Sequence, residues 1–157
     1  MTPELSLIPI YGKSAGRYHL KVWTEAVGNV GIPFFMILDK GAEREAKQLI
    51  KNKVLRYGDN LFILKRGSIE DYYPLDKLIE AIKSEYSLEI QEEEKKEIGE
   101  SPRAERIEKF LKRKGKDPSG WKVRIGRKVA ELMTEDEIDE EIKRIFERIA
   151  TKLRIGL

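Results

Sequence analysis

Acidic side chains follow two apolar segments that are typical of neighbouring β-strands. Asp39 comes directly after the apolar run 32–38, and Glu70 and Asp71 come shortly after the run Leu61–Leu64. The carboxyl ends of parallel strands meet at one edge of a sheet, where open α/β folds place their ligands. Carboxylates gathered there repel one another unless a cation is present, and Mg²⁺ or Mn²⁺ takes oxygen ligands. The three carboxylates are therefore a candidate cluster for a divalent metal ion.

Each of these acids also has a purely structural interpretation. Asp39 is placed to cap a helix that starts near Ala42, because aspartate is favoured just before the first helical turn. Glu70 and Asp71 precede a helix that starts near Pro74, where the helix dipole favours negative charge. The sequence alone leaves both alternatives open.

A second set of candidate residues is basic. Residues 103–128 contain eleven Lys or Arg against three acids, whereas residues 85–100 are mostly acidic. Clusters of Lys and Arg bind the phosphate backbone of nucleic acids. The stretch predicts a nucleic-acid-binding surface, although a solvated turn on a charge-rich protein accounts for the same pattern. Its members are Lys112, Arg113, Lys114, Lys116, Arg124, Arg127 and Lys128.

Apolar periodicity predicts the elements that would position these side chains. Three strands alternate with two helices, and this order implies right-handed crossovers and a parallel sheet. The run 32–38 is continuously apolar, so its strand is expected to be central and buried on both faces. The strands are Leu5–Ile10, Ile32–Leu38 and Leu61–Leu64, and the helices are Arg17–Val27 and Ala42–Val54.

Only helices are expected from Pro74 onward. Ser101-Pro102 and Asp117-Pro118 each place a capping side chain before a proline, which predicts a helix start at both positions. Thr134 and Glu137 predict a capping box for a last helix with one isoleucine-rich face. We therefore expect an α/β core over residues 1–73 and a helical extension over residues 74–157, packed together as a single compact unit.

Composition excludes several kinds of chemistry. The chain has no cysteine and one histidine, His19, so thiol nucleophiles, cysteine-ligated metals and histidine-based sites are not expected. Charged residues make up 38% of the chain, with both signs abundant, as in thermophile proteins. The longest apolar run is far shorter than the roughly 20 residues that span a bilayer, and no signal peptide is evident. We expect a cytoplasmic protein without a membrane partner.

The segments around the acids resemble a known family. Ile37–Gly41, followed by Leu64–Tyr72, resembles the TOPRIM domain of the OLD (overcoming lysogenization defect) nucleases. Leu5–Gly16 resembles that domain's second strand and the loop after it. Trp121–Gly126 resembles the late segment in which such nucleases carry a functional lysine. The resemblance implies a TOPRIM-like three-layer α/β core with a short parallel sheet and a helical C-terminal extension.

What this resemblance implies for function is the hydrolysis of phosphodiester bonds in DNA or RNA by one or two divalent metal ions. Asp39 and Glu70 would be metal ligands, with Asp71 beside them. Lys122 would face the negative charge that develops on the phosphate in the transition state. The alternative for Lys122 is a surface lysine that lies next to Trp121 on a basic helix.

The chain departs from the family pattern in two ways that bear on activity. The strand that delivers the family's first glutamate is expected to be absent, since Glu4 precedes an apolar strand instead of following one, and Gly41 stands where the second acid of an Asp-x-Asp pair is expected. No phosphate loop of an ATPase is present either. We therefore expect weak binding of Mg²⁺ or Mn²⁺ and an enzyme that is incomplete or needs a partner. The alternative is a non-catalytic remnant that binds nucleic acid, or binds protein through the exposed sheet edge. A small-molecule-binding α/β protein ranks last.

Overall fold

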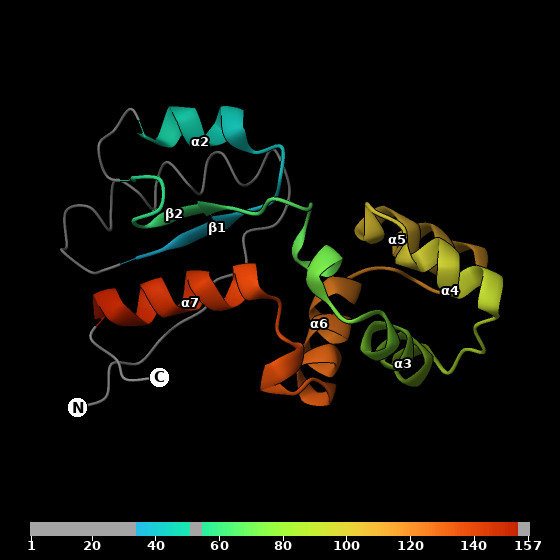
Figure 1. Cartoon of the computed structure of the whole chain (residues 1–157). Helices are drawn as coiled ribbons and strands as arrows, with labels where there is room; N and C mark the ends of the chain where they lie inside the picture. Colours follow the sequence, from blue (N-terminus) through green and yellow to red (C-terminus); the bar gives the residue numbers. More distant parts are fainter. Residues whose placement is uncertain (1–33, 51–54, 154–157) are drawn as a thin grey trace. The chain divides into compact units, whose positions relative to one another are not determined.

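The computed structural model describes residues 34–50 and 55–153 of the chain (Figure 1). Within them the protein is an α/β structure that is mostly helical, with one pair of parallel strands. It divides into two compact units, one formed by Met1–Ile63 with Lys143–Leu157 and the other by Leu64–Ile142. The predicted strand Leu5–Ile10 and the predicted helix Arg17–Val27 lie outside the described residues.

The strand pair confirms the predicted parallel sheet. β1 (Met36–Leu38) and β2 (Leu61–Ile63) run parallel, with Met36 opposite Leu61. Met36 and Leu61 are buried, but Ile37 is 40% exposed. We expected the strand in the run 32–38 to be buried on both faces, and this expectation is wrong at Ile37. Its side chain points away from the face of Met36, because successive strand residues alternate between faces.

The segment between the strands forms a turn and helix α2 (Glu43–Ile50). The backbone of Gly41 in this turn has φ +93°, a conformation that favours glycine. Ala46 of α2 is fully buried in a small core with residues of the strand pair. Figure 1 draws α2 on one side of the strand pair and helix α7 (Glu140–Leu153) on the other.

Polar contacts link helix α7 to the segment directly before β2. Arg148 donates a hydrogen bond to the carbonyl of Gly58 (2.7 Å), and Lys152 pairs with Asp59. Its isoleucines at 142, 145 and 149 are buried, which confirms the predicted apolar face of the last helix.

The second unit is built from four helices around one core. These are α3 (Leu75–Tyr86), α4 (Glu92–Gly99), α5 (Arg103–Arg113) and α6 (Trp121–Leu132). Each helix contributes apolar side chains with little or no exposed surface, as the helical spacing predicts. Residues at the centre of this core are Leu78, Ile82, Ile98, Ile107, Phe110, Trp121, Ile125 and Val129.

Two of the predicted helix starts are wrong. Helix α6 begins at Trp121 and not at Pro118, because the Asp117 carboxylate accepts the N–H of Ser119 (2.9 Å) and forms a turn before the helix. The Thr134–Glu137 pair caps a short 3₁₀ turn, η2 (Glu135–Glu137), and α7 begins only at Glu140. In both cases a capping side chain stabilises a turn that does not continue into the helix.

The two units divide the chain elsewhere than the predicted boundary after Tyr73. Residues 64–73 belong with the helices, because Arg103 and Lys122 bind the turn that contains Glu70. Most of α7 belongs with the strand pair. Among the residues that the structure describes, no helix is long and apolar enough to cross a membrane.

Candidate functional site

Glu70 lies in a short 3₁₀ turn, η1 (Ile69–Tyr72), whose shape is set by its neighbours. The Asp71 carboxylate accepts hydrogen bonds from the N–H and the hydroxyl of Ser68 at 3.0 and 3.3 Å. A Cβ atom at Gly67 would lie 2.3 Å from Oδ2 of Asp71, so glycine at this position leaves room for the carboxylate. The local sequence thus closes a tight turn that fixes the backbone of Glu70.

Arg103 at the start of α5 attaches this turn to the helices. Its guanidinium donates hydrogen bonds to the carbonyl of Glu70 (3.4 Å) and of Tyr73 (2.6 Å), and its backbone N–H donates to Asp71 (3.2 Å). Burial lowers the pKa of the Arg103 guanidinium, and the negative charge of Asp71 opposes this effect. The backbone of the turn, at Glu70 and at Tyr73, is therefore held in place by one partly buried cation.

The side chain of Glu70 is buried and paired on only one of its oxygens. It is 2% exposed, and its Oε1 lies 3.2 Å from Nζ of Lys122 at the start of α6. Its Oε2 is fully buried and has no hydrogen-bond partner in the part of the chain that the structure describes. A buried polar atom left without a partner costs about 1 to 3 kcal/mol, and more when charged. Oε2 is therefore a buried acceptor to which no described residue supplies a donor.

Lys122 faces both the site and the solvent. Its side chain is 45% exposed, while Trp121 beside it is 4% exposed and belongs to the core. A half-exposed ammonium that touches a buried carboxylate is accessible to an anion from solution. The geometry therefore brings together Glu70 and Lys122, two of the three residues that the resemblance implies as catalytic.

Tyr73 adds a third polar group that the sequence analysis did not identify. Burial raises the pKa of the Tyr73 phenol to about 12, and the nearby negative charge of Glu70 adds to this effect. The phenol is therefore neutral at ordinary pH and has a proton that it can donate. No local pattern in the sequence marks it, although a Cβ atom at Gly126 in helix α6 would lie 3.0 Å from the Tyr73 hydroxyl oxygen. Arg103 was missed as well, because no motif marks it.

Asp71 has a structural role in this turn. Its Oδ2 accepts both hydrogen bonds from Ser68, and its Oδ1 accepts the N–H of Arg103. Within residues 34–50 and 55–153, no group of three acidic or histidine side chains is arranged to hold a metal ion. In the 64–142 unit, only Oε2 of Glu70 is a carboxylate oxygen that is buried and unpaired. One such oxygen does not suffice for Mg²⁺ or Mn²⁺, which needs several oxygen ligands.

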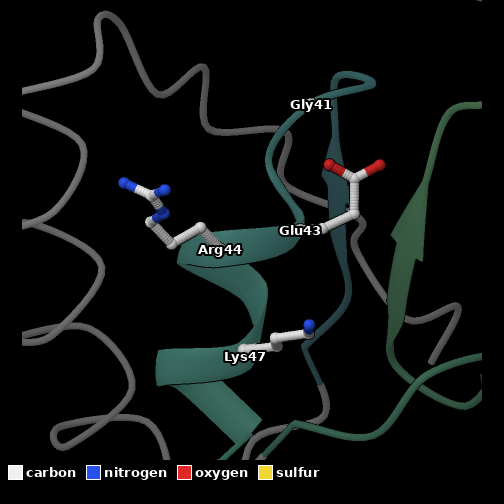
Figure 2. Close-up of a pocket in the computed structure, with 4 residues that line it drawn as sticks. All are labelled: Gly41, Glu43, Arg44 and Lys47. Atoms are coloured by element: carbon white, nitrogen blue, oxygen red, sulfur yellow. The ribbon is translucent and has the colours of Figure 1, made fainter.

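Asp39 lies in the other unit, directly after β1, as predicted. It is exposed, and its carbonyl accepts the N–H of Ala42 (3.2 Å) in the turn that leads to α2. A shallow hollow follows it, lined by Gly41, Glu43, Arg44 and Lys47 (Figure 2). Figure 2 shows the side chains of Glu43 and Arg44 directed to different sides of α2. The shared site of Asp39 with Glu70 stays a prediction.

Most of the predicted nucleic-acid-binding residues are engaged in ion pairs within their own unit. Arg113 and Lys114 pair with Glu97 and Glu94 of α4, at 2.7 and 2.8 Å. Lys112 pairs with Glu108, Arg124 with Glu85, and Arg127 with Glu131. Among the described residues, Lys116 and Lys128 have no carboxylate partner. The basic stretch is thus largely neutralised by neighbouring acids.

The pairs between α4 and α5 predict a stability that depends on pH. The pKa of the Glu94 and Glu97 carboxyls lies below 4.5, because Lys114 and Arg113 donate hydrogen bonds to them. A carboxyl whose pKa is lowered by folding stabilises the folded state fully at pH values above its unfolded pKa. This contribution is lost as the pH falls through the folded pKa. Arg113→Gln with Lys114→Gln should lower the free energy of unfolding at neutral pH by about 0.5 to 1 kcal/mol.

Urea unfolding of wild type and the double variant at neutral and acidic pH measures this effect. We expect the difference between the two proteins to shrink once the pH is well below 4.5. Lys109→Gln with Lys116→Gln is the matched control, because it removes the same charge without touching α4. A difference that is equal at both pH values would contradict the role of these pairs.

Comparison with known proteins found no similar protein. No family model matches the chain, and no curated protein or solved structure matches it.

Proposed function

We propose that the chain is an incomplete, metal-dependent phosphodiester hydrolase of TOPRIM type, related to the OLD nucleases, that needs a partner for full activity. The observation that carries this proposal is the contact between Glu70 and Lys122 at 3.2 Å. The resemblance implies a functional role for both residues, although they are far apart in the sequence. A half-exposed cation beside a buried carboxylate is suited to a phosphate group next to a proton acceptor.

The parallel strand pair supports the TOPRIM-like three-layer fold in this proposal. β1 ends at Leu38, so that Asp39 occupies the carboxyl edge where ligands bind in such folds. The chain leaving β2 at Ile63 leads within a few residues to Glu70. Lys122 would hold the phosphate, and Glu70 would accept a proton. DNA or RNA is the expected substrate.

The proposed metal ion needs ligands from more than one source. The 64–142 unit does not fit Mg²⁺ or Mn²⁺ by itself, because it offers one unpaired buried carboxylate oxygen. Asp39 is the predicted second ligand, and a partner chain would supply the others. Gly41 is not a site where an acid is easily restored, since its φ of +93° strains any residue with a side chain.

Binding of Mn²⁺ tests this proposal directly. We expect weak binding to the wild-type chain in isothermal titration calorimetry. Asp39→Ala and Glu70→Gln should each abolish the signal, because a single remaining carboxylate rarely holds such an ion. Asp76→Asn is the matched control, since this acid is exposed at 71% of its side chain and its nearest cation lies 3.7 Å away. Equal binding by Glu70→Gln and wild type would remove Glu70 from the metal site.

The alternative function is a non-catalytic module that binds nucleic acid. One observation favours it. Both carboxylate oxygens of Asp71 accept hydrogen bonds within the turn, so Asp71 has no free oxygen with which to bind a metal ion beside Glu70. Such a module would bind phosphates through basic residues without cleaving the chain. The two functions differ in their need for Glu70. Metal-dependent hydrolysis requires its carboxylate, whereas a nucleic-acid-binding module does not need a buried acid.

Salt dependence tests nucleic-acid binding in either case. We expect a labelled duplex to bind weakly, with little sequence preference, and with an affinity that falls steeply as salt rises. Lys116→Gln with Lys128→Gln should reduce the log–log salt slope by about 0.9 for each phosphate contact that is lost. Lys47→Gln with Lys77→Gln is the control of equal charge outside the basic stretch. If both double variants give the same log–log salt slope, the basic stretch does not bind the nucleic acid.

A further inference from the structure

Two connections join the two units, and one of them lies inside a helix. The chain passes to the 64–142 unit after Ile63, and it returns within α7, whose residues up to Ile142 still belong to that unit. Sharp bends in helices almost always occur at proline, glycine or a similar local cause, and α7 contains neither residue. On this connection, movement between the units therefore requires the first turn of α7 to leave the 64–142 unit.

The hydroxyl of Tyr72 binds residues of both connections. It donates a hydrogen bond to Oε2 of Glu141 (2.9 Å), and it accepts the backbone N–H groups of Lys65 and Arg66, each at 2.9 Å. Burial raises the pKa of this phenol, so the hydroxyl keeps its proton at ordinary pH and can both donate and accept. Tyr72 is 5% exposed and is the last residue of η1, the turn that contains Glu70. One buried hydroxyl thus joins both connections to this turn.

Charged side chains surround the same phenol. The Arg66 guanidinium lies 5.1 Å from the centre of the Tyr72 ring and pairs with Oδ2 of Asp139 at 2.5 Å. Oδ1 of Asp139 accepts the N–H of Glu141 (2.9 Å) at the start of α7. Oε1 of Glu141 in turn accepts the N–H of Lys65 (3.1 Å). The residues after β2 and the start of α7 are therefore bound directly to each other as well as to Tyr72.

We propose that these residues form a clamp that restrains movement between the two units. The Tyr72 clamp consists of Lys65, Arg66, Tyr72, Asp139 and Glu141. While it is closed, the first turn of α7 stays on the 64–142 unit, and the rest of the same helix stays with the strand pair. When it opens, the residues after β2 and before α7 are free to change their backbone angles, as hinge residues do. Units of one chain commonly move relative to each other, so the clamp controls how freely they do so. It does not depend on the hydrolysis proposed above.

Hydrogen exchange of the backbone amides, followed by NMR on the full chain, tests the clamp. In Tyr72→Phe, the Arg66 amide should exchange about fivefold faster than in wild type, because it loses the hydroxyl that accepts its N–H. The Lys65 amide should be accelerated less, since Glu141 still accepts its N–H. Tyr86→Phe is the matched control, because this hydroxyl is also hydrogen-bonded but contacts α6 and the turn before it. An unchanged rate for the Arg66 amide in Tyr72→Phe overturns the clamp.

The distribution of distances between two spin labels tests the restraint on movement. The chain has no cysteine, so Ser84→Cys in α3 and Thr151→Cys in α7 attach one label at an exposed position of each unit. Tyr72→Phe should broaden this distribution, and Tyr86→Phe should leave its width unchanged. Asp139→Asn removes the ion pair but keeps the phenol, so it should broaden the distribution less, and it replaces Tyr72→Phe in the comparison if that variant does not fold. A width equal to that of the labelled parent overturns the proposal.

Discussion

Replacement of Asp71 by alanine is expected to lower the free energy of unfolding of the 64–142 unit by about 3 kcal/mol. Asp71 is 7% exposed and accepts hydrogen bonds from Ser68 and Arg103. Alanine would leave their N–H groups without this acceptor in a partly buried turn. Urea unfolding followed by the fluorescence of Trp121 measures the change, in a Trp23→Phe background so that Trp121 is the only tryptophan.

Two further variants make this result specific. Asp71→Asn keeps one acceptor oxygen, so we expect a smaller loss of stability than with alanine. Glu80→Ala removes a carboxylate at an exposed position in α3 and should change the free energy of unfolding by less than about 0.5 kcal/mol. A loss of that small size in Asp71→Ala would show that Asp71 is not needed for the turn. The predicted role as a metal ligand would then become the better explanation.

The second large effect is expected in catalysis. The purified chain should not cleave single- or double-stranded DNA or RNA with Mg²⁺ or Mn²⁺ above the level of its Glu70→Gln variant. Two-metal hydrolysis requires ions fixed about 3.5 to 4 Å apart by several carboxylates. Asp39 and Glu70 are the two acids that the resemblance implies, and Gly41 replaces a third. Loss of ligands removes both the affinity for the ions and their geometry.

Addition of a partner separates the two proposed functions. A chain that supplies a strand ending in a glutamate should restore metal-dependent cleavage by an enzyme that needs a partner, and Lys122→Met should abolish the restored activity. A non-catalytic module would stay inactive with every such partner. Robust cleavage by the purified chain alone, lost in Asp39→Ala, would show that the acids present are sufficient. Glu43 or an acid of a second copy would then have to complete the site.

Local patterns in the sequence were enough to predict many of the elements. The apolar runs gave the positions of β1 and β2 and their parallel pairing, because a strand, a helix and a strand in succession permit little else. Helical spacing predicted α3 after Pro74 and the buried isoleucines of α7. Their positions after the apolar runs marked Asp39 and Glu70 as candidates for chemistry, whereas Lys122 was implied by the family resemblance. These features depend on neighbouring residues, so the sequence contains them directly.

Other features depend on contacts between distant parts of the chain, and only the tertiary structure decided them. No local pattern indicates that Arg103 binds the turn at Glu70, that Tyr73 lies against Gly126, or that the acids of α4 neutralise the basic end of α5. The division of the chain near Ile63 is of the same kind, since α7 returns to the strand pair. The burial of Glu70 with one unpaired oxygen results from these contacts. Residue type and spacing could identify this carboxylate, but only packing determines its surroundings.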